Sequence, residues 1–60
     1  MKDARQKITL KDANGDVTEY GRLTGATFFD DESGFREIFE CEDGGELWLT
    51  GDQATRVVSA

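Results

Sequence analysis

Residues 35–50 read FREIFECEDGGELWLT, and this stretch decides the fold. Two short runs rich in apolar and aromatic side chains, residues 35–41 and 46–50, lie on either side of Asp43-Gly44-Gly45. Such runs are typical of strands, because their side chains suit a pleated, half-buried surface. Asp and Gly between two such runs are typical of a β-hairpin turn. The stretch therefore predicts two antiparallel strands.

The two faces of this hairpin have different predicted roles. We take residues 43–45 as a three-residue loop with Gly45 in the left-handed conformation, so that Cys41 lies opposite Leu47. One face is then predicted to be core, and it carries Phe35, Phe39, Cys41, Leu47 and Leu49. The opposite face carries Arg36, Ile38, Glu40, Trp48 and Thr50. Ile38 and Trp48 are thus expected to be diagonal neighbours on the outer face.

A second hairpin is predicted in the N-terminal half of the chain. Residues 6–11 form its first strand, and Asn14-Gly15 is the strongest short hairpin signal. The strand that follows covers residues 17–25. Its register stays open at this point. A two-residue loop places Val17 on the apolar face of the first strand, whereas a three-residue bulged loop places Tyr20 there.

The rest of the chain continues the same pattern. Phe28-Phe29 extends the apolar content, and residues 30–34 form the next turn. Residues 52–55 are predicted to form a short 3₁₀ turn before a last strand over residues 56–59. The chain has no Pro, and seven Gly punctuate its short runs, which is typical of antiparallel barrels and sandwiches. We therefore predict one all-β domain over residues 1–60, a small five-stranded antiparallel SH3-like or Sm-like barrel.

Composition excludes several classes of functional site. The 60 residues contain one Cys and no His, which excludes a zinc finger, an iron–sulfur site and an internal disulfide framework. Residues 12–16 begin like a calcium loop, but Val17 stands where that loop requires Gly. Cys41, expected to face inward, is predicted to be a small hydrophobe rather than a nucleophile. We expect no cofactor, no metal site and no enzymatic activity.

Charge and hydropathy restrict the class of partner. Seven Lys plus Arg against thirteen Asp plus Glu give a net charge of -6. That balance opposes nucleic-acid binding, because Lys and Arg supply most of the affinity for phosphates. No apolar stretch approaches the ~18–20 residues of a membrane span, and no signal-peptide core follows Met1. We therefore expect a cytoplasmic protein with no membrane contact.

The outer-face pair Trp48 and Ile38 is the strongest candidate for an interaction site. Arg36 and Thr50 flank this pair on the same face. Aromatic residues are enriched at the centres of interfaces, and a small barrel with open strand edges gains stability by pairing. In the alternative interpretation, an added element such as a turn at residues 3–6 covers the pair. We expect a module that binds a protein partner and also a second copy of itself through strand edges.

Several stretches resemble motifs of the Sm/LSm family of small β-barrels. Residues 49–53 (LTGDQ), followed by Val57-Val58, resemble the second motif of that family. Residues 21–25 (GRLTG), followed by Phe28, resemble part of its first motif, and Leu10-Lys11-Asp12 also fits. The resemblance implies a five-stranded barrel, often closed into hexameric or heptameric rings through strand edges.

The resemblance also implies an alternative function, nucleic-acid binding. Thr50 stands where the family has an RNA-contacting Arg, and Thr27 and Asp31 stand at the Asp and Asn of its first motif. Uridine recognition of the family kind is therefore not implied. Contacts to nucleic acid would instead come from the basic residues Lys7, Lys11, Arg22 and Arg36.

The acidity of the chain suggests two further alternatives. The first is an acidic inhibitor or nucleic-acid mimic that docks on a basic partner. Its docking surface would consist of Asp30, Asp31, Glu32, Glu40, Glu42 and Asp43. The second is a proteome adapted to high salt, which would explain the charge without any partner.

Overall fold

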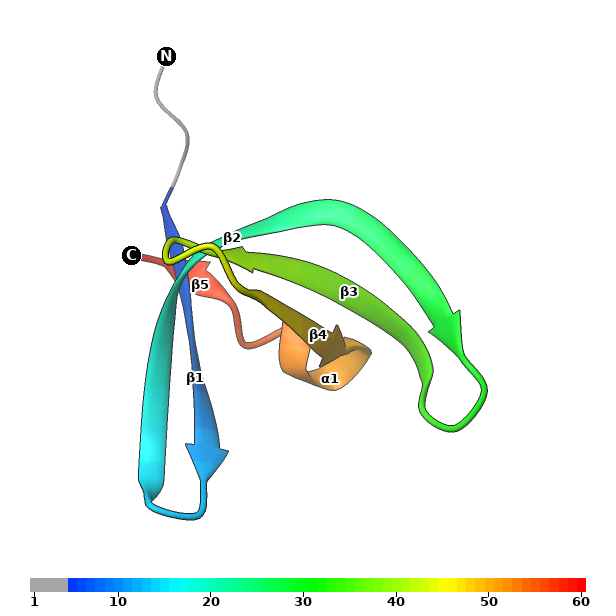
Figure 1. The fold of residues 1–60 in the computed structure, drawn as a ribbon, viewed down its shortest axis with the longest axis horizontal. Helices are drawn as coiled ribbons and strands as arrows, with labels where there is room; N and C mark the ends of the chain where they lie inside the picture. The colour runs from blue at the N-terminus through cyan, green and yellow to red at the C-terminus, as the bar shows by residue number, and fades with distance from the viewer. Residues whose placement is uncertain (1–4) are drawn as a thin grey trace.

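The computed structural model describes residues 5–60 of the chain. Its elements are β1 (Gln6–Asp12), β2 (Gly15–Asp30), β3 (Gly34–Cys41), β4 (Glu46–Thr50), α1 (Gly51–Ala54) and β5 (Val58–Ser59). The strands form one antiparallel sheet in the order β4-β3-β2-β1-β5 (Figure 1). The predicted all-β chain of five antiparallel strands is confirmed. Within residues 5–60 the sheet is not closed, because β4 and β5 are its two edges and do not pair with each other.

β2 connects the two ends of the sheet because its two halves pair with different strands. Residues 15–21 pair with β1, and residues 21–30 pair with β3. The two pairings meet at Gly21, where an added Cβ would lie 1.9 Å from the backbone oxygen of Glu40. Only glycine allows the strands to approach so closely. Farther along, the register shifts within residues 23–27, and this bulge accompanies the bend of β2 in Figure 1.

The first hairpin has a two-residue loop one position earlier than the predicted Asn14-Gly15. Asp12 pairs with Gly15, and Leu10 pairs with Val17. This register selects between the two open alternatives, because it places Val17 on the apolar face of β1. Positive φ occurs at Gly15 and at no non-glycine residue of the described chain.

The second hairpin differs from its predicted register by two residues. Phe39 lies opposite Leu47, and the Cys41 N–H donates to the backbone oxygen of Gly45 at 2.8 Å. The left-handed residue is Gly44, with φ +99°, rather than Gly45. Either glycine of this turn can adopt positive φ without a steric penalty, so the sequence does not distinguish them. An even shift leaves every side chain on its predicted face.

The core of the protein is small. Its buried members are Ile8, Phe39, Cys41 and Leu49, with Leu10, Leu23, Leu47, Ala54 and Val57 packed around them. The prediction that Phe35 belongs to this core is wrong, because its side chain is 67% exposed. The pairing of β3 with β4 begins only at Arg36, so the β2–β3 hairpin extends beyond β4 and α1 (Figure 1).

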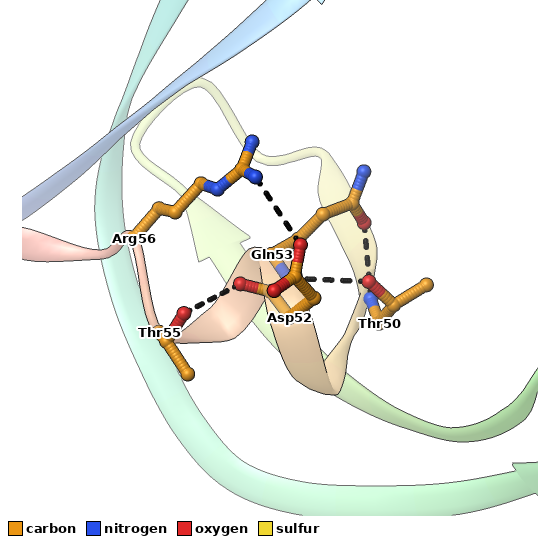
Figure 2. Close-up of polar contacts among 5 residues, drawn as sticks. All are labelled: Thr50, Asp52, Gln53, Thr55 and Arg56. Carbon is orange, nitrogen blue, oxygen red and sulfur yellow. Dashed lines mark hydrogen bonds and ion pairs between the residues drawn. The ribbon is translucent and has the colours of Figure 1, made fainter.

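A four-residue helix, α1, stands in place of the 3₁₀ turn predicted at residues 52–55. Thr50 begins it: the Thr50 Oγ1 accepts from the Gln53 N–H at 3.2 Å (Figure 2). In return, the Gln53 Oε1 accepts from the Thr50 N–H at 3.0 Å. This reciprocal pair is a capping box, which satisfies backbone donors that the first turn leaves unpaired. The chain then continues in turns, so β5 is shorter than the predicted strand at residues 56–59.

Candidate functional site

Three apolar side chains gather on the outer face of β2, β3 and β4, and one of them is exposed. Ile38 on β3 lies directly opposite Trp48 on β4. The ring of Phe28, from β2, packs edge-to-face against the Trp48 indole, with centroids 5.1 Å apart and planes at 77°. Such a geometry is favourable for aromatic pairs. Trp48 remains 56% exposed, whereas Ile38 and Phe28 are half-buried. We call these three residues the outer aromatic cluster.

The structure brings together the predicted pair and adds one residue to it. No segment among residues 5–60 covers Trp48. The turn at residues 3–6, considered above as a cover, has its first two residues outside the described chain. Sequence reasoning missed Phe28 because a bulge sets its position relative to β3, and local patterns do not locate bulges. The available signal was Gly25, which has φ +87° within the bulge.

The Arg36 side chain bonds a backbone group on the unpaired edge of β4. Its guanidinium donates to the backbone oxygen of Trp48 at 2.6 Å and to the Ser33 Oγ at 2.8 Å. Two residues farther along β4, the Thr50 N–H donates to the Gln53 side chain. Side chains thus occupy two backbone groups that an added strand would require. The expectation of an unblocked edge does not hold at this end of β4.

Charges on the outer face nearly balance. Glu40 lies directly opposite Glu46, and like charges in this position are destabilising. Arg22 is the neighbour of Glu40 on β2, and Arg36 lies four residues from Glu40 along β3, on the same face. This surface therefore differs from the chain as a whole, whose net charge is -6.

The basic residues considered for nucleic-acid contacts all occupy this outer face. Lys7 lies opposite Tyr20, which shares its face with Arg22 two positions along β2. The set is spread over β1, β2 and β3 and consists of Lys7, Lys11, Arg22 and Arg36. Aromatic and basic side chains are thus interspersed on one surface.

The predicted acidic surface is divided between the two ends of β3. About 20 Å of strand separates the two groups, because Asp30 pairs with Gly34, and Glu40 lies six residues farther along β3 at ~3.3 Å each. One group is Asp30, Asp31 and Glu32, and the other is Glu40, Glu42 and Asp43. In the first group, the Glu32 N–H donates to the Asp30 carboxylate, and this hydrogen bond is the main cause that lowers the pKa of Asp30. The two groups do not form one continuous docking patch.

Arg5 ties the start of the sheet to the β3–β4 turn. Its guanidinium donates to both carboxylate oxygens of Glu42, with an Nη2–Oε1 distance of 2.9 Å. It also lies over the ring of Tyr20, 4.4 Å from the centroid. The hydrogen bond between Arg5 and Glu42 raises the pKa of Arg5 and lowers the pKa of Glu42. We call Arg5, Tyr20 and Glu42 the outer clasp.

The single thiol lies inward, as predicted. Cys41 is 7% exposed and lines an open cavity of about 520 Å³ together with Arg5 and Glu42. Burial raises the pKa of the Cys41 thiol, and nearby carboxylates raise it further. A raised pKa leaves little thiolate at neutral pH, which opposes a nucleophilic role. No group of three metal-ligating side chains converges within residues 5–60.

Comparisons with known proteins identify no relative of this chain. Family models, curated proteins and solved structures were compared with the chain, and none of them matches. Among residues 5–60 no helix has the length and apolar character needed to cross a membrane.

Proposed function

We propose that this chain is a non-catalytic interaction module of the SH3-like or Sm-like type, and that its outer face binds a second copy of the chain. Two features support the fold type: β5 returns to lie beside β1, and a short helix precedes it. The exposed outer aromatic cluster is the observation that carries the proposed function. Aromatic side chains contribute a large apolar area and are enriched among the residues that dominate binding energy.

The charge pattern favours a second copy as the occupant of this face. A two-fold contact requires a surface complementary to itself. The outer face carries both signs of charge, so Arg36 of one copy can lie near Glu40 and Glu46 of the other. Such a contact relieves the like-charge pair while it buries Trp48. The rest of the molecule is acidic, so repulsion between copies weakens with added salt.

Sedimentation over a wide range of protein concentration tests the proposal. We expect a monomer–dimer equilibrium that strengthens as salt screens the net charge. Trp48→Ala should weaken the dimer by about tenfold or more. Phe35→Ala is the matched control, because it removes an aromatic side chain that is 67% exposed on the opposite face. A strict monomer, or equal dimers in wild type and Trp48→Ala, contradicts the proposal.

Nucleic-acid binding is a second candidate, supported by the gathering of basic and aromatic side chains on the same face. Phosphate contacts with bases stacked on exposed aromatic rings are typical of single-strand binders. Titration of a labelled single-stranded RNA at low salt tests this function. Binding should fall steeply with salt and weaken in Lys7→Gln, with Arg56→Gln as a control at the other end of the chain. Absence of binding at low salt excludes it.

A further inference from the structure

The distal half of β2 has an unpaired edge on the side away from β3. Pairing of β2 with β1 ends at Gly21, and among residues 5–60 the part of β2 from there to Asp30 pairs with β3 alone. α1 makes no contact with β2. Figure 1 shows this part of β2, in green, arching along the outside of the sheet. Within residues 5–60, no strand lies beside the edge at residues 27–29.

The register indicates which backbone groups this edge presents. On β3, the Cys41 N–H bonds toward β4 at Gly45, and the next N–H, of Glu42, bonds toward β2 at Tyr20. Backbone groups alternate along a strand, so even-numbered β3 residues face β2. Phe28 is paired with Arg36 and directs its N–H and C=O toward β3. Thr27 and Phe29 therefore direct theirs away from β3. No Pro or Lys, the residues that commonly protect an edge, occurs within residues 25–30.

Two exposed phenylalanines and one glutamate lie beside this edge on the inner face of the sheet. Phe29 and Phe35 pack edge-to-face with centroids 5.3 Å apart, yet they are 61% and 67% exposed. Glu37 lies on the same face, opposite Thr27 and two positions from Phe35 along β3. Glu37 is half-buried, and its carboxylate makes no hydrogen bond or ion pair with any residue from 5 to 60. By contrast, Glu42 has a cation partner.

We propose that this edge binds an extended, basic segment of another protein as an added strand. Thr27 and Phe29 supply two backbone donors and two acceptors to the added chain. A Lys or Arg placed opposite Thr27 reaches Glu37 across the small threonine, because two strand spacings amount to only about 10 Å. The aliphatic stem of the same side chain packs along the exposed Phe29–Phe35 pair.

The occupant is a basic segment rather than a second copy for a reason visible in the sequence. Residues 25–30 read GATFFD and contain no cation. Pairing this edge with itself would leave Glu37 without a partner in both copies. This surface is separate from the outer aromatic cluster, and its use does not depend on self-association.

A designed peptide and amide exchange test the proposal. The probe is a capped peptide of roughly eight residues in which Lys and Val alternate, and an alternating Glu–Val peptide is its control. On binding of the Lys–Val peptide, hydrogen exchange at the Thr27 and Phe29 amides should slow, and the affinity should fall as salt rises. Thr27→Pro should reduce the affinity by about tenfold or more, since it removes an edge donor that β3 does not use.

Two further variants identify the cation contact and separate this site from the outer face. Glu37→Gln should weaken the peptide severalfold, whereas Asp16→Asn, an equal charge change at the far end of β2, should not. Trp48→Ala should bind the peptide as wild type does. If Thr27→Pro does not fold, a peptide N-methylated at alternate residues serves instead and should bind about tenfold less tightly.

The opposing outcomes are equally definite. Failure of the Lys–Val peptide to bind at low salt overturns the proposal, as does equal binding of the N-methylated peptide. Slowing of the Thr27 and Phe29 amides with protein concentration alone, without peptide, assigns the edge to a second copy and also overturns it. Loss of dimerisation in wild type together with retained peptide binding contradicts the proposed function and leaves this inference standing.

Discussion

Arg5, which precedes β1, forms an ion pair with Glu42, which follows β3, across the full width of β2. The two residues are 37 positions apart in the chain. The Arg5 guanidinium also lies over the ring of Tyr20 in β2, so one side chain links the start of β1, the middle of β2 and the end of β3. The Arg5 carbonyl oxygen accepts from the Ala60 N–H at 2.9 Å, which adds the C-terminus to the same junction. This junction connects distant segments with a small set of exposed contacts.

Arg5→Gln should lower the free energy of unfolding, because it removes both the ion pair and the contact with the Tyr20 ring. The effect should be modest and should shrink as salt rises, since both charged side chains are largely exposed. Urea denaturation at low and high salt measures it. A double-mutant cycle with Glu42→Gln isolates the pair. Additive effects of the two substitutions would show that the ion pair contributes nothing.

The outer clasp also predicts how stability changes with pH. Arg5 lowers the pKa of Glu42 in the folded state below its ordinary value of 4.5, so the unfolded chain binds that proton more readily. The stabilisation is therefore complete above the unfolded-state value and is lost as the pH falls through the folded-state pKa. The pKa of Asp30 is likewise lowered below its ordinary value of 3.8, so protonation of Asp30 reduces stability in the same direction.

Urea midpoints measured between about pH 7 and pH 3 test this dependence. Wild type should lose stability below about pH 4.5, and Glu42→Gln should lose less over the same interval. Asp31→Asn is the control, because the Asp31 carboxylate has no hydrogen bond or ion pair within residues 5–60. Parallel curves for wild type and Glu42→Gln would contradict the assignment.

Gly21→Ala should be strongly destabilising, by about 3 kcal/mol or more, because the added Cβ would lie 1.9 Å from the Glu40 backbone oxygen. The obstruction is backbone, so no side-chain rotation relieves it. Gly51→Ala is the matched control, since nothing lies within 4 Å of a Cβ at that position. Thermal or urea unfolding compares the two. Equal stability of both variants would mean that β2 and β3 can separate at Gly21 without cost.

Most of the sheet follows from local sequence, whereas its register does not. The runs on either side of Asp43-Gly44-Gly45 predict both strands of that hairpin, and their alternation predicts both faces. The turn itself offers two adjacent glycines that can adopt positive φ. For this reason the predicted pairing of the two strands differs from the observed one by two residues, whereas each side chain lies on its predicted face. Local patterns determine which face a side chain occupies, and turn chemistry determines which residue lies opposite.

The candidate sites show the same difference between what local sequence predicts and what depends on distant elements. Trp48 and Ile38 were identified from alternation alone, and their place on an outer face is confirmed. Phe28 and Glu37 were missed because their surroundings depend on a bulge and on where β4 stops. Phe35 was assigned to the core for the same reason: exposure at the end of a hairpin depends on which distant elements cover it. These are long-range properties, and alternation along one strand contains no information about them.

Gln53→Ala should reduce stability by about 1 kcal/mol, because it removes half of the capping box and leaves the Thr50 N–H unpaired. The same N–H lies on the β4 edge, so the variant should also associate more readily at high concentration. Asp52→Asn is the control. The Arg56 guanidinium donates to the Asp52 carboxylate at 3.2 Å (Figure 2), and both side chains are more than half exposed. Its loss should therefore cost less than about 0.5 kcal/mol. Urea unfolding and sedimentation measure the two effects separately. A stable but aggregating Gln53→Ala would show that this side chain protects the edge without stabilising the helix.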